Sequence, residues 1–308
     1  MTTEGQHAAR RVELIEVSPR DGIQNEKVVL STDDKLELLR RIHAAGLRRT
    51  EATSFVSPKR VPQMADAEAV MVGARAEPAH AALIGLVLNQ AGFDRARAAQ
   101  CDEINVVVVA SETFSRKNQG AGIADMVAAA SAILAQSREA GIPASVTIAA
   151  AFGCPFEGEV PAAKVLGLVE SLLPARPDEI AFADTIGCGV PTQVRELLAG
   201  AKALDAGMRL RCHFHNTRST ALANVLAAVE AGVHALDSSI GGFGGCPFAP
   251  AATGNVATED VVYLLERMGI DTGVDLQMLI DTAGWLGDRL GHPPMSGLAR
   301  AGRFPAAA

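Results

Sequence analysis

The sequence predicts an α/β protein of the (β/α)8 (TIM) barrel class, with a short helical appendage at its C-terminal end. Eight short runs rich in β-branched and apolar residues alternate with amphipathic stretches. This alternation extends over about 250 residues, the usual span of one such barrel. No glycine-rich phosphate-binding turn follows the first predicted strand, which disfavours a doubly wound dinucleotide-binding sheet.

The predicted strands are bounded by Gly, Pro or polar residues, as short buried strands usually are. In chain order they are Val12–Val17, Arg49–Ser54, Ala81–Val87, Glu103–Ala110, Ser145–Phe152, Glu179–Asp184, Leu210–His215 and Ala235–Ile240. Between them, stretches such as Asp33–Ala45 and Asp125–Ala140 repeat apolar residues at i, i+3, i+4 and i+7, the pattern of a helix with one buried face. This order is typical of parallel strands joined by crossover helices.

One domain is expected over residues 1–308, with the barrel at about 12–275 and the helical extension at about 276–300. The chain is 48% hydrophobic and 20% charged, which is enough apolar material for one large core. The extension contains the single tryptophan, Trp285, and is too short to form a second core.

The composition also limits which classes of binding partner and which cellular location we expect. The net charge of −7 disfavours nucleic acid and anionic membrane surfaces, so a small-molecule substrate is expected. The five cysteines lack a C-x-x-C pair and are expected to be reduced thiols. Residues 1–11 contain no apolar signal region, and no later run reaches the length of a membrane span. We therefore expect a cytoplasmic protein that binds neither nucleic acid nor membrane.

Polar residues gather where the predicted strands end, and in this barrel class the active site lies at those ends. Two of them, His213 and His215, are separated by one residue, so both imidazoles point to the same side of the strand. Together with Asp21 they offer two imidazoles and one carboxylate, a set that accommodates Mg2+, Mn2+, Co2+ or Zn2+. The alternatives are core or capping histidines, and a cap or an ion pair with Arg20 for Asp21.

A glycine-rich run at residues 241–245 follows the last predicted strand and leads to Cys246. It is not a P-loop, because no Lys-Ser or Lys-Thr follows it. Glycines permit a mobile loop, and a thiol at its tip is placed for reaction with a bound substrate. The alternative is a flexible surface loop with an incidental cysteine.

Several long motifs make the chain resemble the 3-hydroxy-3-methylglutaryl-CoA lyase family, within the wider group of barrel enzymes that includes isopropylmalate and homocitrate synthases. The resemblance covers Val12 to about Leu276. The motifs are Ser18–Glu26, Glu51–Lys59 with Val61–Asp66, Asp184–Gly187, Asp237–Ala249 and Gly254–Asp260. The loop with Cys246 separates the lyases from the synthases, which lack that thiol.

The resemblance implies a metal-dependent carbon–carbon lyase with an acyl-CoA substrate, Mg2+ or Mn2+ as its first choice of metal, and a homodimer or higher homo-oligomer. It implies metal ligation by Asp21, His213, His215 and Asn255. It implies catalytic roles for Arg20, Glu51, Asp184, His213 and Cys246. We further expect substrate contacts from Arg20, Gln24, Lys27, Asn118, Thr185 and Arg218, with Lys27, Arg116 and Lys117 near the coenzyme A phosphates.

The chain departs from the family pattern beside the two histidines. Lyases read His-x-His-Asp-Thr-Tyr or a close variant there, whereas this chain has Asn216 and Arg218 in place of the acid and the tyrosine. Residues 111–120, after the fourth predicted strand, match the family only in part. A guanidinium beside the metal predicts a substrate with an additional polar group, and low kcat/KM on plain 3-hydroxy-3-methylglutaryl-CoA.

The chemistry implied is a retro-Claisen cleavage to acetyl-CoA and acetoacetate. In it, Arg20 stabilises the enolate, Glu51 orients Arg20 or a water, Cys246 protonates the enolate carbon, and Asp184 or His213 removes the hydroxyl proton. Two alternatives remain at this point. One is a Claisen-type synthase that uses the same metal site, and the other is a non-catalytic barrel that serves as a scaffold.

Overall fold

The computed structural model describes residues 11–77, 81–246 and 249–305, with side chains except at Cys246 and residues 249–253. Eight parallel strands close into a barrel in the order β1-β10-β9-β8-β5-β4-β3-β2, which confirms the predicted (β/α)8 class. The strands are β1 (Glu13–Glu16), β2 (Arg49–Ser54), β3 (Ala82–Val87), β4 (Glu103–Val109), β5 (Ala144–Ala149), β8 (Glu179–Asp184), β9 (Leu210–Phe214) and β10 (Ala235–Ser238). Pairing of β1 with β10 closes the ring.

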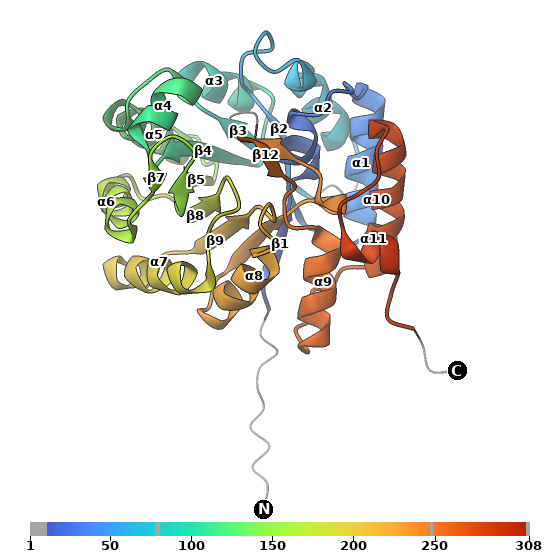
Figure 1. Ribbon diagram of the computed structural model, residues 1–308. Helices are drawn as coiled ribbons and strands as arrows, with labels where there is room; N and C mark the ends of the chain where they lie inside the picture. The colour runs from blue at the N-terminus through green and yellow to red at the C-terminus, as the bar shows by residue number, and fades with distance from the viewer. Residues whose placement is uncertain (1–10, 78–80, 247–248, 306–308) are drawn as a thin grey trace, which may run out of the picture.

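Helices surround the strands on the outside of the barrel (Figure 1). Those of the repeating units are α1 (Thr32–Ala44), α2 (Ala67–Arg75), α3 (Gln90–Ala98), α4 (Glu112–Gln119), α5 (Ile123–Glu139), α6 (Ala162–Leu172), α7 (Pro191–Leu204), α8 (Ala221–Glu230) and α9 (Thr258–Arg267). Within the described residues, no single helix is both long and apolar enough to cross a membrane. Only α4 and α5 taken together meet those limits, and they are bent by 62°.

The ends of α1 show how local sequence sets these boundaries. The Ser31 hydroxyl accepts a hydrogen bond from the Asp34 backbone N–H at 3.1 Å, which caps the first turn. Past the other end, Gly46 has φ of +102°, a conformation that favours glycine. The helix therefore begins one residue before the predicted Asp33 and ends one residue before the predicted Ala45.

Predicted strand ends differ most at β5, which stops at Ala149 and not at the predicted Phe152. Ala150 has φ of +54°, a left-handed conformation that ends an extended strand. The chain then forms a small hairpin of β6 (Gly153–Cys154) and β7 (Gly158–Glu159). The predicted strand extended to Phe152 because the residues after Ala149 are also apolar, and composition does not reveal the bend.

The predicted C-terminal extension contains α10 (Leu276–Leu290) and α11 (Gly297–Ala301). Helix α10 contacts α1 and α9, and the guanidinium of Arg41 in α1 lies 4.8 Å from the Trp285 ring centroid. The Asp275 backbone N–H donates to the Ala45 carbonyl at 2.7 Å. The extension thus packs on the helices of the barrel, as Figure 1 shows for α10 beside α1.

Candidate active site

A wide helical turn, η1 (Ser18–Gly22), directly follows β1 and positions Arg20 and Asp21 at the C-terminal mouth of the barrel. The backbone N–H of Gly22 donates to the Val17 carbonyl at 3.1 Å, five residues back. A Cβ atom on Gly22 would lie 2.7 Å from the Ser239 hydroxyl oxygen, so this close approach requires glycine.

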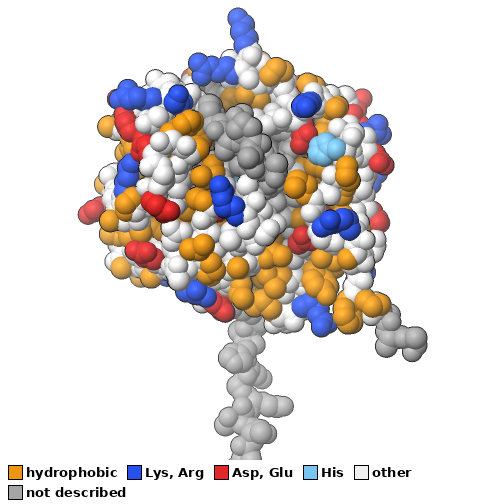
Figure 2. Space-filling view, viewed as in Figure 1, with side chains coloured by type: hydrophobic (Ala, Val, Ile, Leu, Met, Phe, Trp, Pro, Cys, Tyr) orange, Lys and Arg blue, Asp and Glu red, His pale blue; other side chains and the backbone are white. Residues whose placement is uncertain are grey.

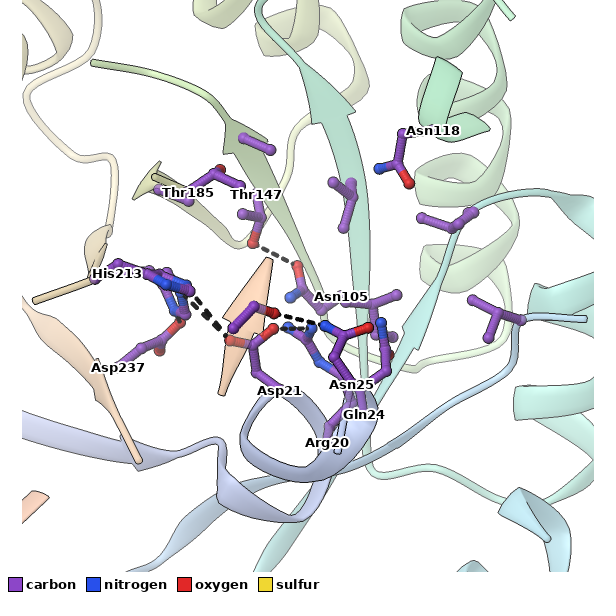
Figure 3. Close-up of a pocket in the computed structure, with 18 of the residues that line it drawn as sticks. Arg20, Asp21, Gln24, Asn25, Asn105, Asn118, Thr147, Thr185, His213 and Asp237 are labelled. Atoms are coloured by element: carbon purple, nitrogen blue, oxygen red, sulfur yellow. Dashed lines mark hydrogen bonds and ion pairs between the residues drawn. The ribbon is translucent and has the colours of Figure 1, made fainter. Parts of the chain in front are cut away.

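A cavity opens at this mouth, and Figure 3 shows Arg20, Asp21, Gln24 and Asn25 on one side of it, facing His213 and Asp237. Its polar lining in the described residues is Arg20, Asp21, Gln24, Asn25, Asn105, Asn118, Thr147, Thr185, His213, His215 and Asp237. Its apolar lining includes Val56, Leu86, Leu88, Val107 and Phe114. Polar groups therefore converge at one end of a partly apolar pocket, as in small-molecule sites.

Three of the predicted metal ligands meet in this cavity. One ligand atom from each of Asp21, His213 and His215 lies within 4.8 Å of the other two. Asp21 Oδ2 is 3.8 Å from His213 Nε2 and 3.6 Å from His215 Nε2. The two rings lie 5.1 Å apart between centroids, and they come from the alternate residues of β9 and its end, as the sequence predicted. This spacing fits a divalent cation between the three groups.

The fourth predicted ligand, Asn255, is held beside them by an antiparallel bridge between its backbone and that of His215. Its Nδ2 donates to Asp21 Oδ2 at 2.8 Å and to the Phe243 carbonyl at 3.0 Å. Asn255 Oδ1 is buried and has no hydrogen-bond partner in the described part of the chain. Since buried polar atoms are rarely left unpaired, this free oxygen beside Asp21 fits a site that holds a cation.

A buried carboxylate orients His213. Its Nδ1 lies 3.1 Å from Asp237 Oδ2, which leaves Nε2 directed toward Asp21. Burial alone would lower the pKa of His213, but the hydrogen bond to Asp237 and the charge of Asp21 raise it. Burial alone would raise the pKa of Asp21, but Arg20 and the two histidines hold it well below its usual range. Asp21 is therefore an ionised carboxylate at neutral pH.

Arg20 is fixed between two acids. Its Nε donates to Glu51 Oε1 and its Nη1 to Asp21 Oδ1. Burial alone would lower the pKa of Arg20, but Glu51 and Asp21 raise it. Glu51 is fully buried, and its other oxygen accepts from Asn105 Nδ2 at 2.7 Å. Glu51 thus contacts Arg20 directly, and its role in catalysis stays a prediction.

Asp184 lies at the end of β8 but does not line the cavity. Its two carboxylate oxygens accept the backbone N–H groups of Cys188 and Gly189, both at 2.9 Å. Burial raises its pKa. This geometry holds the following loop in shape and turns the carboxylate away from the substrate space. Thr185 lines the cavity, and its Oγ1 accepts the Ala150 backbone N–H at 2.9 Å.

The other predicted substrate contacts divide into two groups. Gln24 and Asn118 line the cavity, whereas Lys27 is exposed and does not. Arg218 does not line it either. Its Nη1 donates to the carbonyls of Ile186 and Gly187 at 2.8 and 3.1 Å, so the guanidinium braces the loop after β8. This placement contradicts the prediction that Arg218 lies beside the metal and contacts the acyl group.

Cys246 belongs to β11 (Gly245–Cys246), which pairs with β12 (Ala249–Thr253), but its side chain lies outside the described residues. The residue before it is placed: Gly245 lines the cavity, and its carbonyl accepts Asn25 Nδ2 at 2.6 Å. The chain thus reaches the cavity immediately before the predicted catalytic thiol.

The sequence analysis missed Asp237, Asn105 and Thr147. Asn105 Oδ1 accepts the Thr147 hydroxyl at 2.9 Å, and its amide holds Glu51. All three are polar residues inside predicted strands, where alternation places side chains in the barrel interior. A polar residue in a mostly apolar predicted strand was the sequence signal that could have identified these three residues as part of the site.

Lys and Arg side chains are spread over the face of the molecule in Figure 2, with Asp and Glu side chains among them. Among the predicted rim cations, Arg116 pairs with Glu112 at 2.6 Å, and Lys117 Nζ lies 5.2 Å from the Phe156 ring centroid. Any anionic substrate must therefore be held by local groups rather than by a broad basic surface.

Comparison with known proteins agrees with this geometry. The HMGL-like family profile matches residues 11–285. The chain is 42% identical to the mitochondrial hydroxymethylglutaryl-CoA lyase of Gallus gallus over 95% of its own length and 98% of that protein. It is 38% identical to the hydroxymethylglutaryl-CoA lyase YngG of Bacillus subtilis, over 92% and 95% of the two chains.

Among solved structures, an HMG-CoA lyase from Acinetobacter baumannii in complex with coenzyme A and 3-methylmalate superposes with a TM-score of 0.91, at 39% identity and full coverage of both chains. The carboxyl transferase domain of Rhizobium etli pyruvate carboxylase shares only the fold, with a TM-score of 0.71 at 18% identity. Fold, site geometry and full-length identity together place the chain in the HMGL-like family of carbon–carbon lyases, among the hydroxymethylglutaryl-CoA lyases.

Proposed function

We propose that the chain cleaves 3-hydroxy-3-methylglutaryl-CoA to acetyl-CoA and acetoacetate by a metal-dependent retro-Claisen reaction. The observation that carries the proposal is the meeting of Asp21, His213 and His215 in the cavity that Arg20 also lines. Lyases of similar length named for this substrate support it. We also propose a cytoplasmic location, and a homodimer or higher homo-oligomer stays a prediction.

Asp21, His213, His215 and Asn255 are the residues that would hold the metal. Two imidazoles, a carboxylate and an amide accommodate Mg2+ or Mn2+, our first choice, as well as Co2+ or Zn2+. When bound, such a cation supplies Lewis-acid polarisation of the tertiary hydroxyl and a fixed point for the substrate.

Arg20 stabilises the charge that appears during cleavage. When the carbon–carbon bond breaks, its electron pair moves into the thioester group as an enolate, with negative charge on oxygen. Arg20 remains a cation at any working pH and is held rigidly by Glu51, so its donors need no reorganisation as this charge forms.

We assign removal of the hydroxyl proton to His213. Of the two predicted bases, Asp184 faces backbone amides away from the cavity, whereas His213 lines the cavity and is held by Asp237. Nε2 of His213 cannot hold a cation and accept a proton at once. In this assignment Asp21, His215 and Asn255 would be the residues left to hold the metal.

Cys246 is the proposed acid that protonates the enolate carbon to give acetyl-CoA. Support comes from the preceding residue, since Gly245 lines the cavity and is tied to Asn25. The thiolate left on Cys246 and the imidazolium left on His213 balance in charge. Loss of the proton from the His213 imidazolium to solvent and uptake of one proton from solvent by the thiolate then restore the free enzyme.

We propose coenzyme A binding along the side of the cavity lined by Asn118, because the exposed cations Arg116 and Lys117 lie on the same helix, α4. Lys27 remains a candidate for the opposite rim. The coenzyme A and 3-methylmalate bound in the Acinetobacter lyase support an acyl-CoA substrate for this chain too.

A cleavage assay with Mn2+ and Mg2+ tests the function. We expect purified protein to release acetyl-CoA and acetoacetate from 3-hydroxy-3-methylglutaryl-CoA, faster than from citramalyl-CoA or a 3-hydroxyglutaryl-CoA with a longer branch. The second arm incubates the protein with acetyl-CoA and a panel of 2-oxo acids. Release of free coenzyme A there, without cleavage in the first arm, would replace the lyase by the Claisen-type synthase.

A further inference from the structure

A second arginine lies beneath the candidate site, inside the barrel. Arg211 is the second residue of β9 (Leu210–Phe214) and precedes His213 by two positions. Alternation along the strand therefore directs both side chains to the barrel interior, with Arg211 one layer below. Its side chain is 1% exposed, and it does not line the cavity. It has no route to a substrate and must act through its neighbours.

On one side Arg211 holds the carboxylate that orients His213. Its Nε lies 2.6 Å from Asp237 Oδ1, and its Nη2 donates to Asp237 Oδ2 at 2.9 Å. That second oxygen also contacts His213 Nδ1 at 3.1 Å. This two-point contact, one hydrogen bond and one ion-pair contact, reaches both oxygens of the carboxylate and restrains it, and the carboxylate in turn restrains the ring.

On the other side Arg211 faces the carboxylate that orients Arg20. Its Nη2 is 3.7 Å from Glu51 Oε2, while Glu51 Oε1 accepts Arg20 Nε. Glu51 and Asp237 are both buried. One guanidinium thus stands between the acid that holds His213 and the acid that holds Arg20.

We propose that Arg211 is a positioning residue that sets His213 and Arg20 in a fixed relation, and so supports both metal binding and turnover. This inference rests on the proposed lyase function. Without Arg211, the buried carboxylates of Asp237 and Glu51 would lose the guanidinium that contacts both of them. Each acid would then turn toward its remaining partner and shift His213 or Arg20.

The competing explanation is that Arg211 only neutralises an acidic barrel interior. Arg49 provides the matched control. It is also an arginine of the barrel interior, with ion pairs to Glu13, Glu103 and Glu179 at 2.9, 2.7 and 3.1 Å. None of these three acids lines the cavity or contacts a predicted ligand in the described residues. Glu179 Oε1 also lies 3.7 Å from Arg211 Nη1, so the two arginines share one acid, and a purely neutralising role makes their loss equivalent.

The test compares Arg211→Met, Arg211→Lys and Arg49→Met with wild type. Mn2+ affinity is measured by calorimetry without substrate, kcat and KM by steady-state cleavage, and stability by thermal unfolding. We expect Arg211→Met to bind Mn2+ about 10- to 100-fold more weakly, the range for loss of an outer partner of a ligating histidine. Its kcat should fall with KM nearly unchanged.

Arg211→Lys keeps the charge but not the two-point contact, so it should recover thermal stability while Mn2+ affinity stays below wild type. Arg49→Met should lose stability yet bind Mn2+ as wild type does. Equal Mn2+ affinities in wild type and Arg211→Met, or equal losses in Arg211→Met and Arg49→Met, would overturn the proposal. If Arg211→Met does not fold, wild-type Mn2+ affinity in Arg211→Lys overturns it. A wild-type protein that neither binds Mn2+ nor cleaves 3-hydroxy-3-methylglutaryl-CoA would instead remove the proposed function.

Discussion

The N-terminal end of the barrel interior and the C-terminal mouth contain the same kinds of charged residue in different states of pairing. At the N-terminal end, Arg49 contacts three acids at 3.1 Å or less. At the mouth, Asp21, His213 and His215 converge, and Asn255 Oδ1 beside them has no hydrogen-bond partner in the residues described.

This difference separates structural charges from functional ones. Charged side chains that form ion pairs with one another, such as Arg49 and its acids, stabilise the fold and leave no group free to bind a ligand. Donor atoms that converge without partners stay available, and the surrounding fold must hold them in place against their desolvation. Residue type alone does not distinguish the two, and Arg20 and Asp21 are themselves paired; what differs is that the groups at the mouth line the cavity, whereas Arg49 and its acids do not.

The largest predicted effect follows from removing one charge at each end. Asp21→Ala should reduce kcat/KM by more than about 100-fold, beyond the loss typical of an outer-shell change, because a ligand itself is gone. Its unfolding temperature should stay near wild type. Arg49→Met should lose about 3 kcal/mol of unfolding free energy, since buried acids are left without a partner, and should keep its kcat/KM.

Chemical denaturation and steady-state kinetics on both variants measure these outcomes. Full turnover and normal Mn2+ binding in Asp21→Ala would remove the mouth as the metal site. A drop in kcat/KM in Arg49→Met as deep as that of Asp21→Ala would erase the distinction between the two ends.

A buried acid with no cationic partner among the described residues gives the next effect. Glu16 ends β1, is fully buried, and accepts from the Ser18 and Ile240 backbone N–H groups at 2.8 and 2.9 Å and from the Thr258 hydroxyl at 2.6 Å. Burial raises its pKa from 4.5 to about 7, against these hydrogen bonds. The folded state therefore binds its proton more tightly than the unfolded state does.

Stability from this group is complete below about pH 4.5 and is lost as pH rises to about 7, by at most about 3 kcal/mol. Glu16→Gln keeps an oxygen for the two amides and removes the titration. Its unfolding free energy should exceed that of wild type at pH 8 and match it more closely at pH 5. Urea unfolding at both pH values decides, and an identical pH dependence in the two proteins would contradict the prediction.

The smallest effect concerns Arg218. Because its guanidinium donates to two loop carbonyls outside the cavity, Arg218→Ala should lose about 1 kcal/mol of stability, the order of a net hydrogen bond. Arg218→Tyr should leave kcat/KM on 3-hydroxy-3-methylglutaryl-CoA unchanged. A clear rise in that ratio would restore the sequence-based view that Arg218 limits the acyl pocket.

Much of the fold was predictable because buried parallel strands and amphipathic helices differ in period. The strand with His213 and His215 was predicted within one residue, and alternation correctly placed both rings on one side. Strand ends were less predictable, since the left-handed turn at Ala150 has no signal in an alanine-rich run.

Site residues were predictable from the sequence where the residue type itself indicates a function, as for the two histidines. They were not predictable where hydrogen-bond partners determine which way a side chain points. Asp184 and Arg218 stand at plausible positions in the sequence, but backbone partners turn both away from the cavity. Asp237 and Arg211 lie in adjacent strands far apart in sequence from β2, so their link to Glu51 appears only once the barrel closes.

The bridge between His215 and Asn255 has a consequence for biosynthesis. Asp21 follows the first strand, the histidines belong to the seventh, and Asn255 lies beyond the eighth, across the seam where β10 meets β1. A nascent chain thus carries no complete cation site until nearly all of the barrel has left the ribosome. Metal bound at the proposed site would therefore stabilise only the closed barrel, and partly synthesised chains would not be stabilised by it.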